Sequence, residues 1–422
     1  MRGSLNISGG GLIKATILCQ AAILFLTCAC HTPTVTAKTW HVPGDAATIQ
    51  DGINLASAND TVIVACGTYY EYDLKMKSGV CLRSATGDAG CVTIDAQQQD
   101  RVFYCRFVTS AARIEGFTIT GGFASEGGGL YCLDNSSPSL KNCVISGDSA
   151  SDWGGGVYCS VNSSPAFVNC AITGNSAESG GGGMYCLENS SPALTDCSIS
   201  GNSATTGGGM LCYHFCSPTL TNCTISNNWS VYGGGIRVSL NCDATLTDCT
   251  FSDNVADSRG GGMGTAFGGS ATLTNCTFLN NSAYSGGAVC LASDGSVTFT
   301  NCSLIGNSAS SDGGGIKIQC NGGCASTTLI SCSLTDNSAR TGGGIYLEGA
   351  TYFAADTTEF HNNTASTSGA NGYVESEGEV VLTCCVSDLG GFEGDGTITL
   401  NNEGCFSPTE PTTWGRLKAL YR

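Results

Sequence analysis

Apolar and polar residues alternate over short stretches from about residue 111 to 400, and this pattern predicts strands and not helices. In Gly156-Val157-Tyr158-Cys159, Val157 and Cys159 share one face while Tyr158 lies on the other. The same inward pairing is expected at Leu130/Cys132, Met184/Cys186, Met210/Cys212, Ile236/Val238, Ile316/Ile318 and Ile345/Leu347. No longer segment of this region has helical periodicity, so helical repeats fit the pattern poorly.

A second kind of stretch must bend. In Leu220-Thr221-Asn222-Cys223-Thr224-Ile225, the two outer apolar residues lie an odd number of positions apart, so no straight strand buries both. Asn222 is the expected bend residue because asparagine tolerates left-handed backbone angles. The equivalent positions hold Asn142, Asn169, Asp196, Asp248, Asn275 and Asn301.

Three markers recur in phase along the chain. The third glycine of each glycine triplet falls at Gly129, Gly156, Gly183, Gly209, Gly235, Gly262, Gly287, Gly315 and Gly344. A cysteine keeps the same period at Cys143, Cys170, Cys197, Cys223, Cys249, Cys276, Cys302 and Cys332. An asparagine follows at Asn175, Asn202, Asn228, Asn254, Asn281, Asn307, Asn337 and Asn363. A period near 26–27 residues predicts an all-β solenoid, one coil of a parallel β-helix per repeat, and is too short for a propeller blade.

The repeated asparagines also match the acceptor pattern for glycosylation, as Asn-Ser-Ser or Asn-Ser-Ala. Because they recur once per coil in the same phase, we interpret them as stacked turn residues. The glycine triplets are interpreted as backbone turns and not as phosphate-binding loops, since no helix is predicted after them.

Residues 38–110 keep β character but lose the strict period. Residues 47–56 place Ile49, Ile53 and Leu55 near one helical face, and a strand follows at 60–69. We expect this short helix to cap the open end of the apolar core, because an uncovered solenoid end would be an exposed edge. The predicted organisation is a leader at 1–37, a cap with the first coils at 38–110, regular repeats at 111–400 and a tail at 401–422.

The first 37 residues have the pattern of a signal peptide. Arg2 and Lys14 precede an apolar run up to Cys30, and small residues before Lys38 suit cleavage after Ala37. Lipidation at Cys28 or Cys30 is the alternative. The apolar run is too short to span a bilayer comfortably, and no transmembrane segment is expected in the mature chain. For the basic, aromatic tail at 414–422, a capping helix and a sorting signal both remain open.

The net charge and the cysteine content restrict which binding partners and cofactors the chain is expected to have. The formal net charge of −17 argues against nucleic acid and anionic membranes as partners. The 27 cysteines show no metal-binding spacing with the four histidines, so no metal site and no cofactor is predicted. The cysteines are expected to fill the core, form disulfides, or both. The candidate bridges are Cys216–Cys242, which lie at one position of adjacent coils, and Cys320–Cys324, which bracket Asn321-Gly322-Gly323.

Two segments carry a family resemblance. Residues 48–53, followed by 62–64 and Gly67-Thr68-Tyr69, resemble the entry of right-handed β-helix proteins of the pectin-lyase-like superfamily. Residues 278–289 are similar to the repeat of polymorphic outer membrane proteins, Phe-x-x-Asn followed by Gly-Gly-Ala-Val. The resemblance implies a right-handed parallel β-helix, and it implies little about function because the superfamily includes polysaccharide lyases, hydrolases and esterases.

No catalytic residue is predicted. Asp196 and Asp248 are in phase but two coils apart, at bend positions shared with asparagine, so we interpret them as turn residues. The cations Arg237, Arg259, Lys317 and Arg340 look scattered, with no acidic cluster in phase beside them. Coil length hardly varies, which leaves no long loops to wall a groove.

The residues suggest a binding surface instead. Tyr131, Tyr158 and Tyr185 occupy one outward position of three consecutive coils, and an exposed aromatic stripe of this kind could stack on the sugars of a linear glycan. Alternatively, stacked tyrosines merely favour β-structure. We therefore predict a protein that is secreted or on the outer surface of a bacterium, with a structural or adhesive role and a polysaccharide or cell-surface glycan as possible partner. The alternative is a polysaccharide lyase or hydrolase.

Overall fold

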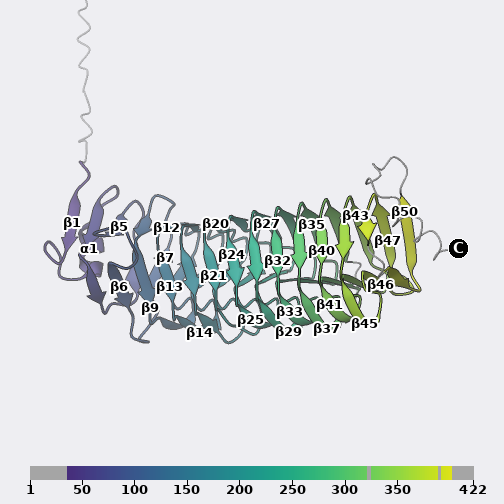
Figure 1. Cartoon of the computed structure of the whole chain (residues 1–422). Helices are drawn as coiled ribbons and strands as arrows, with labels where there is room; N and C mark the ends of the chain where they lie inside the picture. The colour runs from purple at the N-terminus through teal and green to yellow at the C-terminus, as the bar shows by residue number, and fades with distance from the viewer. Residues whose placement is uncertain (1–35, 321–324, 388–390, 402–422) are drawn as a thin grey trace, which may run out of the picture. The chain divides into compact units, whose positions relative to one another are not determined.

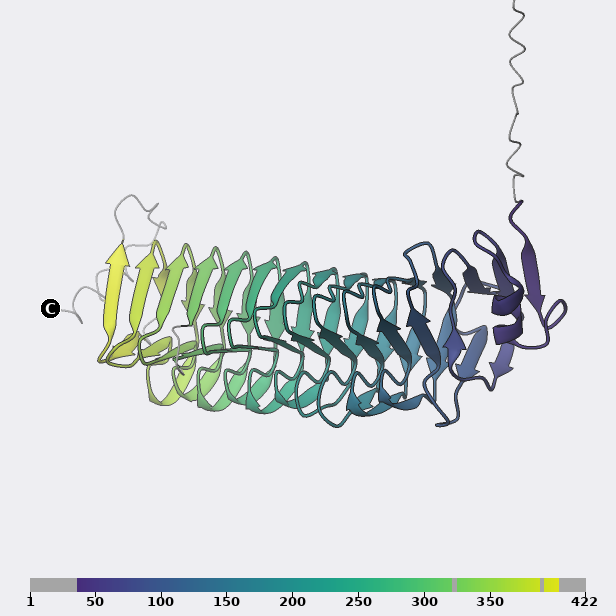
Figure 2. The ribbon, with the colours of Figure 1, turned by 180° about the vertical axis from the view of Figure 1, so that it is seen from behind.

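The computed structural model describes residues 36–320, 325–387 and 391–401. Within them the chain winds into coils that stack from β1 to β50, and α1 lies at the N-terminal end of the stack (Figures 1 and 2). Equivalent strands of successive coils pair in parallel, as in the register Leu220↔Leu246 and Leu246↔Leu273. The predicted parallel β-helix is confirmed.

Four faces run along the stack. Sheet A contains β1 (Thr39–Val42), β2 (Thr61–Val64), β5 (Cys81–Ser84), β8 (Arg113–Glu115), β12 (Ser139–Lys141), β16 (Ala166–Val168), β20 (Ala193–Thr195), β23 (Thr219–Thr221), β27 (Asp243–Thr247), β31 (Ser270–Thr274), β35 (Ser296–Thr300), β39 (Ser326–Ile330), β43 (Tyr352–Asp356), β47 (Glu379–Thr383) and β50 (Thr397–Asn401). Sheet B contains β3 (Gly67–Tyr69), β6 (Val92–Asp95), β9 (Phe117–Thr120), β13 (Val144–Ser146), β17 (Ala171–Thr173), β21 (Ser198–Ser200), β24 (Thr224–Ser226), β28 (Thr250–Ser252), β32 (Thr277–Leu279), β36 (Ser303–Ile305), β40 (Ser333–Thr335), β44 (Glu359–His361) and β48 (Val386–Ser387).

The other two faces complete each coil. Sheet C contains β4 (Leu74–Lys75), β7 (Phe103–Arg106), β11 (Leu130–Leu133), β15 (Val157–Cys159), β19 (Met184–Leu187), β22 (Met210–Tyr213), β26 (Ile236–Ser239), β30 (Met263–Ala266), β34 (Val289–Ala292), β38 (Ile316–Gln319), β42 (Ile345–Glu348), β46 (Gly372–Val374) and β49 (Phe392–Gly394). Sheet D has two parts, first β10 (Phe123–Glu126), β14 (Ser149–Trp153) and β18 (Ser176–Ala177), then β25 (Trp229–Tyr232), β29 (Val255–Arg259), β33 (Ser282–Ser285), β37 (Ser308–Asp312), β41 (Ser338–Thr341) and β45 (Thr364–Ser368).

The helix α1 (Ile49–Leu55) lies where the sequence predicts a cap. Thr48 caps it, its hydroxyl accepting from the backbone N–H of Asp51. Ile49 and Ile53 are buried as expected, but Leu55 is 47% exposed, which corrects the predicted face. The reason is helical geometry, because residues 49, 52 and 53 share one side and residue 55 falls on the other. Gly52 permits the close approach, since a Cβ there would lie 2.9 Å from a methyl of Val62.

The bend between sheets A and B occurs at the predicted residues. Asn142, Asn169, Asp196, Asn222, Asp248, Asn275 and Asn301 all have φ between 51° and 55°. The turn reverses the inward face of the chain, so that Leu220 before it and Ile225 after it are both buried. Asp196 and Asp248 are therefore turn residues, as expected.

The repeated asparagines form a ladder inside the coils. Asn175, Asn202, Asn228, Asn254, Asn281, Asn307, Asn337 and Asn363 are at most 5% exposed. From Asn175 to Asn337, each side-chain amide donates to the amide oxygen of the next coil and to a backbone carbonyl, as Asn254 does to Asn281 at 2.9 Å and to Ile225 at 2.8 Å. The Asn281 side-chain oxygen also accepts from the backbone N–H of Asn254. The stacked-turn interpretation is confirmed, and a buried amide of the folded chain is closed to glycosylation.

The cysteine column beside the bends consists of thiols. Cys143, Cys170, Cys197, Cys223, Cys249, Cys276, Cys302 and Cys332 are buried and free. Their sulfurs lie within hydrogen-bonding distance of the carbonyl two residues earlier, as for Cys249 and Thr247 at 3.3 Å. Of the two alternatives, these residues are core fillers and not bridges.

The predicted Cys216–Cys242 bridge is absent. The residues stack on adjacent coils as expected, but both are free, buried thiols. Each sulfur is engaged with backbone, since Cys216 Sγ donates to the Tyr213 carbonyl at 3.4 Å and Cys242 Sγ accepts from the Cys216 N–H at 3.1 Å. The Cys320–Cys324 pair lies outside the described residues because Cys324 does.

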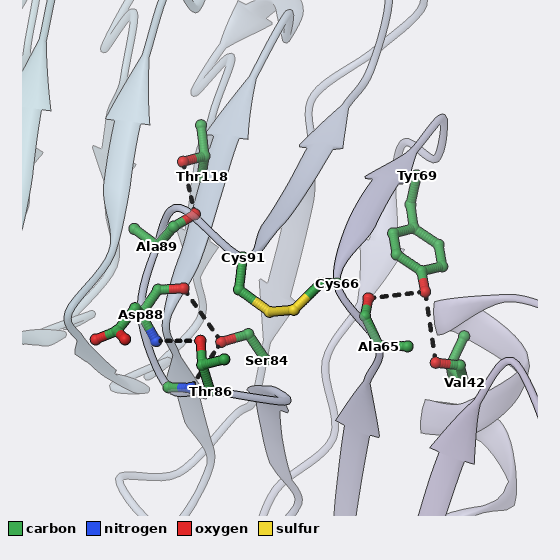
Figure 3. The surroundings of a disulfide bond; sticks show 11 residues. Val42, Ala65, Cys66, Tyr69, Ser84, Thr86, Asp88, Ala89, Cys91 and Thr118 are labelled. Atoms are coloured by element: carbon green, nitrogen blue, oxygen red, sulfur yellow. Dashed lines mark hydrogen bonds between the residues drawn. A yellow bond between two sulfur atoms is a disulfide. The ribbon is translucent and has the colours of Figure 1, made fainter.

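A disulfide joins Cys66 to Cys91 near the N-terminal end (Figure 3). Each cysteine directly precedes a strand of sheet B, and Gly67↔Val92 are in register, so the bridge occupies the place that later coils give to the asparagine bend. The periodicity of the sequence does not predict this bridge, because residues 38–110 do not keep the strict period.

Replacing both cysteines with serine is expected to lower the free energy of unfolding by roughly 3–4 kcal/mol, because the bridge links residues 25 positions apart. Denaturant unfolding of both proteins measures the difference. In the presence of a reductant, the wild type and the Cys66→Ser/Cys91→Ser variant should have the same free energy of unfolding. Equal stability of oxidised wild type and variant would contradict the expectation.

Within the described residues, no helix is long and apolar enough to cross a membrane.

Candidate ligand-binding surface

Two columns of side chains face each other along one corner of the stack, and we call them the C–D surface. The outward column of sheet C contains Tyr104, Tyr131, Tyr158, Tyr185, Leu211, Arg237, Gly264, Cys290, Lys317, Tyr346, Tyr373 and Glu393. The column of sheet D contains Trp153, Gly180, Thr206, Tyr232, Arg259, Ser285, Asp312, Thr341 and Ser368. Ring and ion contacts join the columns at Trp153–Tyr185, Tyr232–Arg237 and Asp312–Lys317. Parallel register therefore creates a continuous surface from residues one coil apart.

The first section of the C–D surface is aromatic. Tyr131 and Tyr158 stack with ring centroids 5.1 Å apart, and Tyr158 and Tyr185 follow at 5.5 Å. The three side chains form a cluster separate from the solenoid core, so they do point outward. However, they are only 9%, 5% and 3% exposed, which contradicts the expected exposed stripe.

Neighbouring side chains cover these rings. Trp153 stacks on Tyr185 at 4.9 Å, and the guanidinium of Arg101 lies 4.3 Å from the Tyr131 centroid. Outward alternation predicts the direction of a side chain but not what lies over it. A sugar has no free tyrosine face here in the described structure, and a role for Tyr131, Tyr158 and Tyr185 in ligand binding stays an untested prediction.

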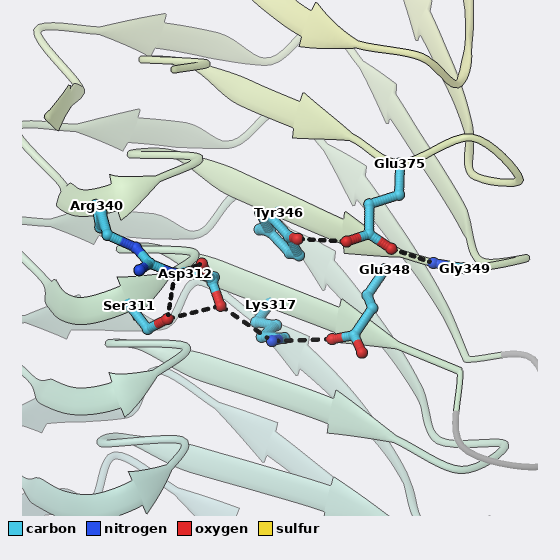
Figure 4. A network of polar contacts seen from close by, with 8 residues as sticks. All are labelled: Ser311, Asp312, Lys317, Arg340, Tyr346, Glu348, Gly349 and Glu375. Atoms are coloured by element: carbon cyan, nitrogen blue, oxygen red, sulfur yellow. Dashed lines mark hydrogen bonds and ion pairs between the residues drawn. The ribbon is translucent and has the colours of Figure 1, made fainter. Parts of the chain in front are cut away.

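The last section of the C–D surface is an ion-paired network (Figure 4). The Lys317 ammonium lies 2.9 Å from Glu348 and 3.3 Å from Asp312, and Arg340 contacts the other oxygen of Asp312 at 3.7 Å. Ser311 donates to Asp312 at 2.9 Å. The sequence-based view that Lys317 and Arg340 are scattered is thus wrong. The register of the coils indicates these contacts. Glu348 is the partner in the next coil of Gln319, which lies two residues after Lys317, and Asp312 lies on the facing sheet D column.

Tyr346 extends this network. Its hydroxyl donates to Glu375 at 2.6 Å, and Glu375 also accepts from the backbone N–H of Gly349 at 3.2 Å. The Tyr346 ring stacks on Tyr373 at 5.6 Å and lies 5.1 Å from the Lys317 ammonium. These contacts fix the ring between a cation on one side and an aromatic residue on the other.

The protonation of this network limits its chemistry. Burial alone would lower the pKa of Lys317, but the hydrogen bond and charge of Glu348 outweigh it and raise the pKa. Burial, together with the hydrogen bond to Glu375, raises the pKa of Tyr346. A general base must be unprotonated at the working pH. Neither Lys317 nor Tyr346 is therefore suited to remove a proton at neutral pH.

A polar groove of about 600 Å³ follows the bends between sheets A and B. Asn142, Asn169, Asp196 and Asn222 line it. Their side chains bond to one another from coil to coil, as Asn169 to Asn142 at 2.9 Å and Asn222 to Asp196 at 2.6 Å. Across the described ranges, no group of three or more histidine, cysteine, aspartate or glutamate residues is placed to hold a metal ion.

A family model agrees with this architecture. The family model described as right handed beta helix region matches residues 94–251 and 211–402. Curated proteins give no significant match. Solved structures similar to the chain include pectate lyase Pel9A (11% identity, 79% of this chain and 78% of that chain, TM-score 0.33) and the Agl-KA catalytic domain (12% identity, 85% and 69%, TM-score 0.46). The A-module of mannuronan C-5 epimerase AlgE6 from Azotobacter vinelandii also matches (13% identity, 88% and 100%, TM-score 0.40).

At these identities the likeness to solved structures concerns the fold alone. The family model, in contrast, covers more than half of the sequence, from the second coil to the last strand. Together with the parallel register of the four sheets, this match places the chain in the right-handed β-helix family.

Proposed function

We propose that this chain is an exported β-helix protein with a structural or adhesive role that binds a polysaccharide along the C–D surface without cleaving it. The supporting observation is the outward column of sheet C, which carries aromatic or charged side chains on most coils and is interrupted at Leu211, Gly264 and Cys290. Adjacent strands are about 4.8 Å apart, so a linear polymer lying along the column would meet a new register position at each coil.

Three features support export. A disulfide such as Cys66–Cys91 forms and persists in oxidising compartments. The leader-like pattern of residues 1–37 and the net charge of −17 suit a protein released to or displayed on the surface of a bacterium. Residues 1–35 of the leader and the tail at 414–422 lie outside the described residues.

The absence of cleavage is proposed from the state of the network around Lys317. Both carboxylates that contact its ammonium are held in ion pairs, and the pKa of Lys317 is raised. An enzyme of the lyase kind needs a neutral base, and a glycoside hydrolase needs one protonated and one ionised carboxyl. The alternative function, a polysaccharide lyase or hydrolase, would require this network to open.

A glycan-array screen of purified residues 38–422 tests the proposal. We expect binding to at least one polysaccharide, with no release of unsaturated or reducing ends from the bound polymer. A protein that released such ends, and lost this activity in Lys317→Met while still folded, would be an enzyme and would contradict the proposal. Failure to bind any polysaccharide would contradict the binding role.

A further inference from the structure

The middle of the C–D surface holds two arginines without acidic partners. Arg237 lies on the sheet C column and Arg259 on the sheet D column one coil further on, and both are half-buried. The Arg237 guanidinium extends over Gly264, where a Cβ would lie 3.0 Å from its Nη1 atom. A larger residue at 264 would therefore displace the arginine, so the glycine gives it this position.

The register positions that follow the two arginines, Gly264, Cys290 and Ser285, are small and uncharged. Ser285 pairs in register with Asp312 of the next coil. Asp312 is the acid that forms ion pairs with Lys317 and Arg340. Cys290 likewise pairs in register with Lys317. In the part of the chain that the structure describes, neither Arg237 nor Arg259 forms an ion pair, and the side-chain bond of Arg237 is from Nε to Ser239 Oγ at 3.2 Å.

The electrostatics of this pair are unfavourable as they stand. Burial lowers the pKa of Arg237, and the like charge of Arg259 lowers it further, while Cys290 acts in the opposite direction. A partly desolvated cation costs free energy until a counter-charge or hydrogen-bond acceptors compensate it. Guanidinium groups present paired N–H donors that match the oxygens of a carboxylate or sulfate. An anion between the two side chains would supply the negative charge that Asp312 supplies to Lys317 and Arg340.

We infer that Arg237 and Arg259 form a subsite for an anionic sugar unit, which carries a carboxylate or a sulfate ester, within a polysaccharide that follows the C–D surface. The inference rests on the proposed function for the polymeric nature of the ligand. Tyr232, which is 37% exposed with its ring 5.7 Å from the Arg237 guanidinium, adds an accessible aromatic face beside the charge. The overall charge of −17 repels polyanions, so attraction of an acidic polymer must come from a local site.

The test is titration calorimetry of purified residues 38–422 with three polymers: polygalacturonate, dextran sulfate and neutral dextran. We expect an acidic polymer to bind, with affinity falling as salt increases. Arg237→Gln/Arg259→Gln should weaken this binding at least tenfold. The control is Arg106→Gln/Arg113→Gln, which removes the same charge from two exposed arginines that are already paired with acids and lie outside the C–D surface, and it should change affinity less than twofold. Whichever acidic polymer binds identifies the carboxylate or the sulfate as the recognised group.

A second variant tests the site with both arginines present. Ser285→Asp places an internal carboxylate at the register position of Asp312, and we expect it to compete with the polymer and weaken binding to the same extent. Circular dichroism melting checks that each variant is folded. Binding of an acidic polymer that neither variant weakens would overturn the subsite. Binding of neutral dextran or an array glycan alone would overturn the subsite and leave the proposed function standing, whereas no binding to any glycan would overturn both.

Discussion

Asn254→Ala is expected to lower the free energy of unfolding by roughly 3–5 kcal/mol, because the substitution leaves several buried polar groups without partners. Asn254 donates to Asn281 and to the carbonyl of Ile225, and its oxygen accepts from the backbone and side-chain amides of Asn228. Its exposed fraction is 0%, so water does not replace these bonds without opening the coil. Urea denaturation followed by circular dichroism measures the loss.

The matched control is Thr272→Ala, on the exposed outer face of sheet A in the following coil. A surface substitution of this kind is expected to change stability by about 0.5 kcal/mol or less. If Asn254→Ala were no more destabilising than Thr272→Ala, the ladder would contribute little to stability, and the repeated asparagines would need another explanation.

The second large effect is expected at Asp148, where the ladder begins with a carboxyl instead of an amide. Its Oδ1 accepts from the backbone N–H of Gly122 at 2.7 Å, as the amide oxygens of later coils do. Its Oδ2 is buried without a partner. In the next coil the atom at this position is the Asn175 nitrogen, which donates to the Ile145 carbonyl and to Asn202. The Asp148 oxygen therefore takes the place of a donor, and we expect it to be protonated.

Burial raises the pKa of Asp148 well above its usual value, the bond from Gly122 offsets part of this, and the charge of Asp95 raises it again. A raised folded-state pKa means that the folded chain binds a proton more tightly than the unfolded chain. The contribution of this proton to the free energy of unfolding is complete below the unfolded pKa of about 3.9. It is lost as pH rises toward the folded pKa, by about 1.4 kcal/mol per pH unit.

Asp148→Asn supplies the missing N–H at every pH, so we expect it to stabilise the protein increasingly from pH 4 to pH 8. Denaturant titrations of both proteins at several pH values measure the difference. Asp95→Asn is the comparison. This substitution should remove only the part of the Asp148 pKa rise that comes from the Asp95 charge, which is smaller than the part that comes from burial. A difference between Asp148→Asn and wild type that does not change with pH would show that Asp148 is not protonated in the folded state.

The fold could be predicted from sequence because its determinants are local and repeated. The bend asparagines, the alternation of Val157, Tyr158 and Cys159, and the phase of the buried ladder each depend on a few neighbouring residues. Asp148 could also have been placed, since Gly147-Asp148-Ser149-Ala150 has the phase of Gly174-Asn175-Ser176-Ala177. Residues 38–110 lack this repetition, so the Cys66–Cys91 pair was missed.

The candidate site was less predictable because it depends on contacts between coils and between faces. Alternation correctly places Tyr158 and Lys317 outside the core, but it does not show that Trp153 and Arg101 cover the tyrosines. It also does not show that Asp312, five residues before Lys317, turns back from sheet D to meet it. Register gives the neighbour within a sheet, whereas the corner between sheets C and D depends on the glycine turns. A Cβ on Gly156, for example, would lie 2.7 Å from the Gly183 carbonyl oxygen.

The direction of the asparagine ladder has a consequence for how such a chain can change in length. Every amide from Asn175 to Asn337 donates forward to the coil that follows it, and the series closes when Asn363 donates to Asn371. Since each coil receives and gives the same bonds, an insertion or deletion of one complete repeat preserves every pairing at the new junction. A change of another length keeps the pairing only where a turn between sheets absorbs it, as between Asn307 and Asn337, which pair across 30 residues where other coils use 26 or 27. Variation in the size of this protein is therefore expected as whole coils or within turns, and not within the strands.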